Sequence, residues 1–223
     1  MKSLQAGLPI TARAGRPRSK PRLRTVLAVA FALILSACAT APPSNTRDAC
    51  GIFEEHRDWF KAAKKSEDRW KIPMSVSLAF IGQESAFQQK AKPQRTRILG
   101  IIPGPRPSDA YGYAQALKGT WKDYKRDTGN TISSRSDFAD AVDFIGWYNA
   151  RSVKENRIAP NDAYNLYLAY HEGQGGFRQK TFTKKAWLIE VARGVQSTAT
   201  QYEQQLQRCE KTLGRGWLRR LLF

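Results

Sequence analysis

"PMSVSLAFIGQESAF", Pro73 to Phe87, is the stretch of the sequence that decides the fold. Proline is favoured in the first turn of a helix, and apolar residues then recur every three or four positions, so we expect a helix with a buried face. Glu84 is four residues from Phe80 and three from Ile81, which places it on that apolar face. A carboxylate there is costly unless it is paired or used in chemistry, and burial should raise its pKa.

Helical patterns continue outside this stretch and predict a mainly α domain with little or no β structure over residues 50–213. The segments with helical spacing or end signals are residues 52–65, 119–129, about 136–155, about 161–172 and a long last helix over about 188–213. Residues 91–109 contain four prolines and two glycines and predict a long loop. One interpretation is that the basic residues of this loop line an anionic groove. The alternative is that the segment is a solvated surface loop.

The first 37 residues have the pattern of an export signal. They contain seven Lys and Arg residues and no acidic residue, and the apolar run "VLAVAFALIL" (residues 26–35) is too short to span a bilayer comfortably. The junction "LSAC", ending at Cys38, resembles the bacterial lipobox. That resemblance implies lipidation of Cys38 and, with Ala39 after it, a periplasmic protein anchored to the outer membrane. An ordinary signal peptide, cut near "ACA", is the alternative.

The net charge of +18 includes this leader. Cleavage before Cys38 leaves 30 basic and 19 acidic residues, a net charge of +11. An exported basic protein without a nucleic-acid recognition motif is expected to meet an anionic cell-wall polymer or a membrane surface, and not nucleic acid.

The segments at the two ends of the domain differ from it in composition. Residues 38–49 are small, polar and proline-bearing and predict a flexible tether. Residues 214–223 form a basic amphipathic tail, which lies on a membrane interface or folds back on the domain.

Cys50 and Cys209 remain once Cys38 is lipidated, and an exported protein lives in a disulfide-permissive compartment. Cys209 also lies on the apolar stripe of the last helix. We therefore predict a Cys50–Cys209 bridge, with two separate thiols as the alternative.

The chemistry-bearing residues fall in three segments: "QESAF" around Glu84, "YGYAQAL" from residue 111 and "AYHEGQGGF" from residue 169. The chain has two histidines and no metal-binding spacing, phosphate loop or nucleophile elbow, so we predict no metal and no cofactor. Gln115 offers a donor and an acceptor, whereas Tyr113 and Tyr170 offer flat faces for sugar rings and hydroxyl groups for hydrogen bonds.

The order "ES…GYAQ…AYHEG" on a mostly helical domain resembles the lytic transglycosylases with an SLT domain, which have a lysozyme-like fold with a groove and are similar to goose-type lysozyme in glycoside hydrolase family 23. The resemblance covers roughly residues 50–210 and rests on short motifs. Tyr113 and Ala114 stand where the family has Leu-Met, and His171 and Glu172 where it has Asn-Ala. His171 is either a substrate contact or a structural histidine.

The resemblance implies roles for single residues. Glu84 matches the catalytic acid/base, and Ser85 matches the serine that places the glycan or the glutamate. Gln115 matches the glutamine that contacts the sugar, and Tyr170 matches the tyrosine that hydrogen-bonds near the glutamate.

The implied reaction cleaves the β-1,4 bond between N-acetylmuramic acid and N-acetylglucosamine in peptidoglycan and forms a 1,6-anhydro ring. It needs one enzyme carboxylate, although Glu172 is the nearest candidate for a second. Two alternatives stay open: a lysozyme-type hydrolase of the same bond, and a non-catalytic peptidoglycan-binding lipoprotein.

Overall fold

The computed structural model describes residues 40–98 and 101–215, which belong to one compact unit. The leader, the lipobox with Cys38 and the tail from residue 216 onward lie outside the described residues.

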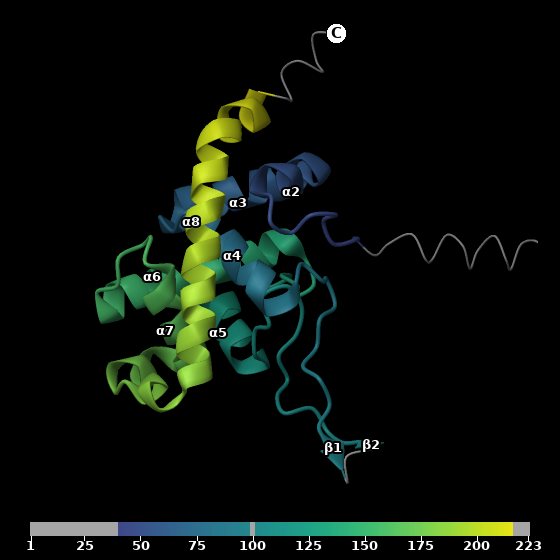
Figure 1. The fold of residues 1–223 in the computed structure, drawn as a ribbon, viewed down its shortest axis with the longest axis vertical. Helices are drawn as coiled ribbons and strands as arrows, with labels where there is room; N and C mark the ends of the chain where they lie inside the picture. Colours follow the sequence, from purple (N-terminus) through teal and green to yellow (C-terminus); the bar gives the residue numbers. More distant parts are fainter. Residues whose placement is uncertain (1–39, 99–100, 216–223) are drawn as a thin grey trace, which may run out of the picture. The chain divides into compact units, whose positions relative to one another are not determined.

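The described residues are mainly helical, as the sequence predicts, with one short hairpin (Figure 1). The elements in chain order are α2 (Ala49–Glu55), α3 (Arg57–Trp70), α4 (Met74–Ser85), β1 (Arg97–Ile98), β2 (Ile102–Pro103), α5 (Lys118–Thr128), α6 (Phe138–Asn156), α7 (Ala163–Arg178), the 3-10 helix η2 (Thr181–Lys184) and α8 (Ala186–Arg215).

Helix α4 is the centre of the domain. Its first eight residues, from Met74 to Ile81, are all buried, because α8, α3 and α6 pack around it. A helix that is apolar on every side is expected to lie inside a domain. Exposure begins only in the last turn, at Gly82, Gln83 and Glu84. The position of the expected catalytic carboxylate is therefore fixed by the most deeply buried helix.

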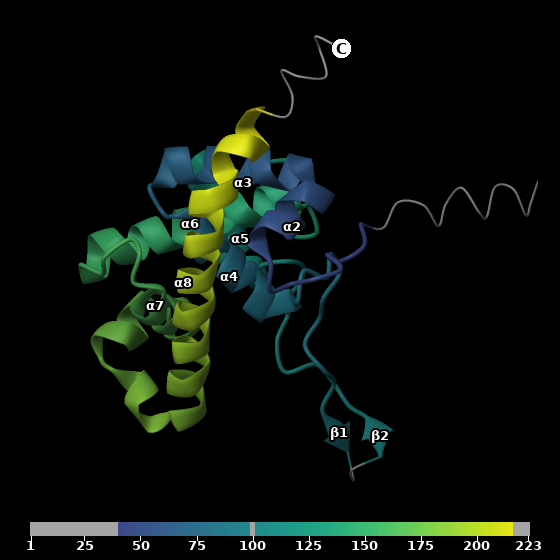
Figure 2. The same cartoon turned by 45° about the horizontal axis from the view of Figure 1, so that its top comes forward.

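Helix α8 runs along the body of the domain and covers α4 (Figures 1 and 2). At 1.5 Å per residue, its 30 residues extend about 45 Å. The predicted apolar stripe is buried, and Leu188, Val195, Tyr202 and Leu206 all belong to the core. Near the far end of the helix, Cys209 forms the predicted disulfide with Cys50, with an S–S distance of 2.08 Å.

The segment before α2 is packed against the domain, which corrects the expectation of a flexible tether over residues 38–49 for its described part. Pro43 is buried. The Tyr202 hydroxyl donates to the Thr46 carbonyl, and Gln205 donates to the Arg47 carbonyl at 3.0 Å. Composition alone suggested a tether, whereas hydroxyl and amide groups on α8 supply partners for this backbone.

Two glycines lie where the sequence predicts helix ends, but only one of them ends a helix. Gly129 follows α5 with a φ of 72°, a left-handed conformation that glycine adopts without strain. Gly173 has a φ of 75° and a ψ of 163° and interrupts α7, but helical turns resume after it as far as Arg178. The expected end at Gly173 is thus a kink.

The long loop over residues 91–109 contains a hairpin. Strands β1 and β2 are antiparallel, with Ile98 opposite Ile102. Both views show the hairpin projecting away from the helices (Figures 1 and 2).

Candidate active site

Glu84 lies in the last turn of α4. The chain leaves the helix through Ala86 and Phe87, both in the left-handed conformation with φ values of 47° and 61°. Burial raises the pKa of Glu84 to about 7, and a hydrogen bond with the Tyr167 hydroxyl offsets a smaller part of this effect. Glu84 as a whole is partly exposed, but its carboxyl group is largely removed from water. No Lys, Arg or His of residues 40–98 and 101–215 contributes to the shift, so no cation compensates for this desolvation.

Two tyrosines on one face of α7 stand behind this carboxyl group. Tyr167 and Tyr170 are three residues apart and both pack edge-on against Phe80, with ring centroids at 5.3 and 5.4 Å. Phe80 lies one helical turn before Glu84 on α4. The same aromatic contact therefore sets the distance between α4 and α7 and brings the tyrosines to the carboxyl group.

Tyr167 is the tyrosine whose hydrogen bond affects the pKa of Glu84. Tyr170, expected to hydrogen-bond near Glu84, also lies close enough for the Glu84 charge to act on it. The Tyr170 hydroxyl donates to the Ala114 carbonyl at 2.5 Å, which ties α7 to the turn before α5. Burial, together with the nearby Glu84 charge, raises the pKa of Tyr170 well above its ordinary range, so this hydroxyl keeps its proton. The three-residue spacing of 167 and 170 places both side chains on one helix face, but it does not decide which hydroxyl group reaches the carboxyl group.

The turn that contains Gln115 is closed by a bridge between Tyr111 and Ala116. Gly112 has a φ of 79°, and a Cβ atom there would lie 1.8 Å from the Arg135 carbonyl oxygen, so only glycine fits. The Gln115 amide donates to the Ala91 carbonyl at 3.1 Å and to the Gly112 carbonyl at 2.9 Å. Its donor is thus used within the turn, which leaves the amide oxygen as the group for a ligand.

Ser85 is buried and donates to the Ile81 carbonyl of its own helix at 3.0 Å. Its expected role beside Glu84 stays a prediction. Tyr113 is 1% exposed and packs edge-on against Trp59 and Phe138. The expectation that its face is open to a sugar ring is wrong for this structure, because aromatic rings cover it.

His171 and Glu172 form a cluster with the start of α8. The His171 Nδ1 lies 3.0 Å from the Glu172 carboxylate, and the Lys185 Nζ lies 2.6 Å from the same oxygen. Burial opposes ionisation of Glu172, but hydrogen bonds from Lys185, Thr181 and His171 outweigh it and lower its pKa to about 2. These contacts therefore favour the ionised form of Glu172 near neutral pH. His171 packs edge-on against the exposed Trp187.

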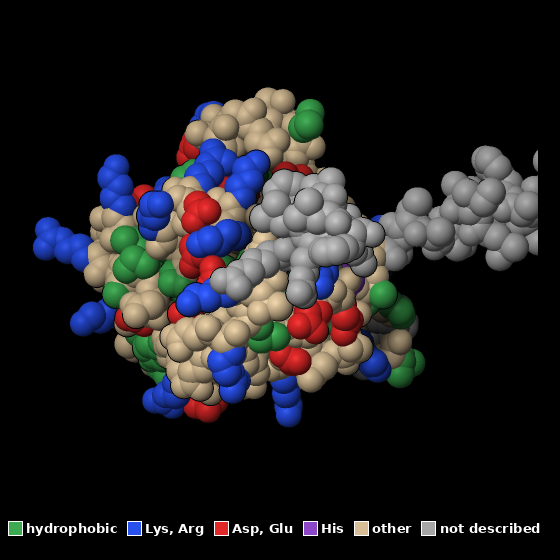
Figure 3. Space-filling model, turned by 90° about the horizontal axis from the view of Figure 1, so that it is seen from above, with side chains coloured by type: hydrophobic (Ala, Val, Ile, Leu, Met, Phe, Trp, Pro, Cys, Tyr) green, Lys and Arg blue, Asp and Glu red, His purple; other side chains and the backbone are tan. Residues whose placement is uncertain are grey.

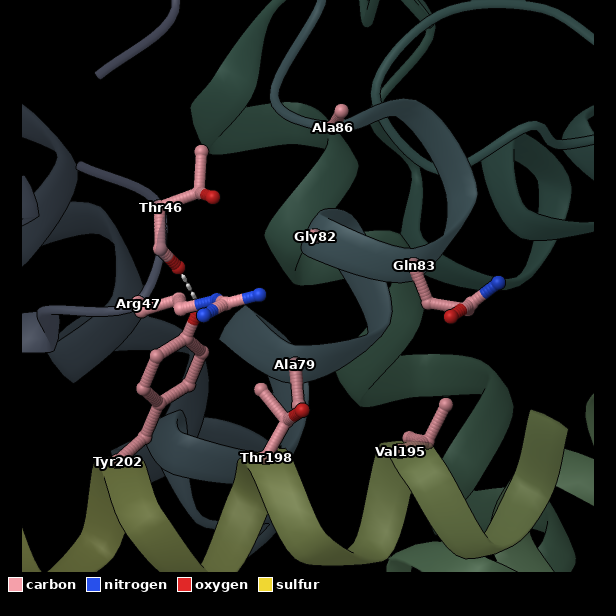
Figure 4. Close-up of a pocket in the computed structure, with 9 residues that line it drawn as sticks. All are labelled: Thr46, Arg47, Ala79, Gly82, Gln83, Ala86, Val195, Thr198 and Tyr202. Atoms are coloured by element: carbon pink, nitrogen blue, oxygen red, sulfur yellow. Dashed lines mark hydrogen bonds between the residues drawn. The ribbon is translucent and has the colours of Figure 1, made fainter. Parts of the chain in front are cut away.

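Two hollows in the described surface lie away from Glu84. One, of about 530 Å³, is bounded by the segment before α2, by α4 and by α8 (Figure 4). Its α4 residues include Ala79 and Gly82, on the side of the helix away from Glu84. The other, of about 410 Å³, includes Tyr113 and Thr40. Within the described residues, no group of three or more His, Cys, Asp and Glu side chains is arranged to hold a metal ion.

The domain is mainly helical, and burial raises the pKa of a carboxyl group at the end of its central helix. A carboxyl group in such an environment can act as a general acid near neutral pH. The family model described as "Transglycosylase SLT domain" matches residues 26–209, and the chain belongs to this family. This match confirms the resemblance seen in the sequence and indicates a lytic transglycosylase domain that acts on peptidoglycan. No curated protein matches the sequence significantly.

Proposed function

We propose that the protein is a lytic transglycosylase that cleaves the β-1,4 bond between N-acetylmuramic acid and N-acetylglucosamine, with Glu84 as the general acid and base. The observation that carries this proposal is the environment of Glu84. Its pKa of about 7 leaves the protonated and ionised forms both populated near neutral pH. A group that first gives and then takes a proton needs such a pKa.

In the first step, protonated Glu84 gives its proton to the glycosidic oxygen as the bond from that oxygen to C1 of the muramic acid breaks. The N-acetyl group of the same sugar stabilises the cationic carbon. In the second step, the Glu84 carboxylate takes the proton of the 6-hydroxyl group, whose oxygen bonds to C1 and closes the 1,6-anhydro ring. Glu84 is then protonated again for the next cycle.

Tyr167 opposes part of the effect of burial, because its hydrogen bond favours the ionised form of Glu84. It holds the pKa of Glu84 near neutrality. The amide oxygen of Gln115 accepts a hydrogen bond from a sugar hydroxyl or amide. His171, partly exposed beside Trp187, contacts the glycan strand at a sugar farther from the cleaved bond.

We also propose a location for the enzyme in the cell. Lipidation of Cys38 after removal of residues 1–37 would tether the enzyme to the outer membrane on its periplasmic side, where peptidoglycan is within reach. No described helix is long and apolar enough to cross a membrane.

The test is digestion of purified peptidoglycan by wild type and Glu84→Gln. Gln83→Ala is the matched control, because Gln83 is the exposed neighbour on the same helix. We expect the control to release soluble fragments at the wild-type rate and Glu84→Gln to lose about 100-fold to 10,000-fold of the rate, the range for a general acid. Equal release by Glu84→Gln would remove Glu84 from the mechanism. Binding without release by wild type would favour the non-catalytic lipoprotein.

A further inference from the structure

The hairpin that projects from the domain, here called the basic arm, comprises residues 92–98 and 101–108. Hydrogen bonds along its stem hold it together. The Thr96 amide donates to the Pro105 carbonyl at 3.0 Å, and the Gly104 amide donates to the Thr96 carbonyl at 2.7 Å. Arg95 adds a bond to the Gly104 carbonyl at 3.3 Å. Backbone and side-chain hydrogen bonds therefore join the two sides of the arm along its described stem.

The arm carries charge of a single sign. It contains Lys92, Arg95, Arg97 and Arg106 and no acidic residue, and all four side chains are exposed. The face of the domain shown in Figure 3 is different, because acidic side chains are interspersed there among the lysines and arginines. Uncompensated positive charge on a projecting element attracts an anionic surface.

One exposed apolar side chain lies near the end of the described part of the arm. Ile101 is 81% exposed and lies directly before β2, beyond the four cations of the stem. Scattered single exposed apolar residues are common, but this one lies on a projection whose described charged residues are all cations. A fitting partner therefore has a negatively charged surface and an apolar layer beneath that surface.

We infer that the basic arm docks on an anionic phospholipid membrane, with Ile101 entering the interface and the cations lying among the headgroups. Anionic leaflets attract basic segments and take up apolar side chains. A glycan strand offers hydroxyl groups and carboxylates but no apolar depth. The inference does not depend on catalysis by Glu84.

The base of the arm connects docking to the candidate active site. The Ala91 carbonyl, just before the arm, accepts hydrogen bonds from the Gly112 amide at 3.0 Å and from the Gln115 side chain at 3.1 Å. An arm fixed on a membrane thus holds the Gln115 turn at a set orientation above the lipid. A lipid anchor at Cys38 would supply tethering, whereas the arm supplies orientation.

The test uses chains that start at residue 39, made without the leader so that no acyl group is attached. The described residues from 40 to 215 belong to one compact unit with its own core. Partitioning is measured by sedimentation with phosphatidylcholine vesicles that contain or lack phosphatidylglycerol. We expect wild type to bind only the anionic vesicles, with affinity falling as salt rises.

Two arm variants separate the two contributions. Ile101→Ser should lower partitioning about tenfold by removing apolar burial, and Arg97→Gln should lower it about fivefold. The matched controls are Ile132→Ser, which changes an isoleucine that is 92% exposed outside the arm, and Arg208→Gln, which changes an exposed arginine on α8. Both controls should bind as wild type does. All four chains share the tail, so any contribution of the tail cancels.

Wild-type partitioning by both arm variants would overturn the inference, as would equal losses in arm and control variants. Loss of binding to purified peptidoglycan instead of to vesicles would show that the arm contacts the glycan. Glu84→Gln should bind vesicles as wild type does, so failure of the proposed catalysis and failure of the docking surface give different results.

Discussion

The hydroxyl group of Tyr167 forms a hydrogen bond with the carboxyl group of Glu84, and this contact joins the last turn of α4 to the middle of α7. It is the polar contact that favours the ionised form of Glu84, which burial disfavours. The position of a single hydroxyl group thus adjusts the pKa on which the proposed mechanism depends.

Removing that hydroxyl group should move the pH profile of the enzyme. In Tyr167→Phe the carboxylate loses its hydrogen bond, so the pKa of Glu84 rises further and the acid form persists to higher pH. We expect the alkaline limb of kcat/KM to shift up by about one pH unit, since a hydrogen bond to a charged group contributes about 1.5 kcal/mol or more. Tyr164→Phe, a partly buried tyrosine on the same helix, should leave the limb in place. An unchanged limb in Tyr167→Phe would show that the contact does not tune Glu84.

Glu84→Gln should make the protein more stable at high pH than wild type. The folded-state pKa of about 7 lies above the ordinary value of 4.5, so the folded chain keeps a proton that the unfolded chain has lost. The contribution of Glu84 to the free energy of unfolding is fully present below pH 4.5 and is lost as the pH rises through 7. The free energy of unfolding should fall by about 3 kcal/mol over this range in wild type, whereas glutamine does not titrate and causes no such fall. Denaturant unfolding at pH 4 and pH 8 measures the difference, and parallel stability curves for the two proteins would contradict it.

Gly112→Ala should destabilise the Gln115 turn. A methyl group there meets the Arg135 carbonyl oxygen at 1.8 Å, at a φ that alanine rarely adopts. We expect a loss of about 3 kcal/mol or more in the free energy of unfolding, together with reduced activity. Gly119→Ala is the control, because it lies in α5 with no atom within 4 Å and should stabilise slightly. Equal effects of the two substitutions would mean that the close approach at Gly112 is absent.

Loss of the disulfide should lower stability more than activity. The bridge joins residues 159 positions apart, so it restricts a long loop of the unfolded chain. The double variant Cys50→Ser with Cys209→Ser should lose about 2–5 kcal/mol in denaturant unfolding. Wild type in reductant should match the variant, and a reductant-insensitive wild type would show that the bridge does not form in solution.

Patterns within one element were predictable from the sequence. Helical spacing placed Glu84 on the apolar face of α4, and the stripe on α8 placed Cys209 on the inner side. Local rules are enough in these cases, because a helix repeats every 3.6 residues wherever it lies.

The contacts between side chains of different helices were not predictable from the sequence. Tyr167 and Tyr170 share a face of α7, and only the packing of that face on Phe80 decides which hydroxyl group reaches Glu84. Tyr113 looked suited to stack on a sugar, but Trp59 covers its ring from a helix about 50 residues away in sequence.

A transglycosylase and a hydrolase differ in which oxygen bonds to C1 of the muramic acid after the glycosidic bond breaks. Purified peptidoglycan is digested by wild type in water enriched in ¹⁸O, and the released muropeptides are weighed by mass spectrometry. If the 6-hydroxyl group closes the ring under Glu84 catalysis, the products lack one water and carry no label, and Glu84→Gln forms none. Reducing-end products that carry ¹⁸O would show that water attacks the sugar and would contradict the proposed transglycosylase.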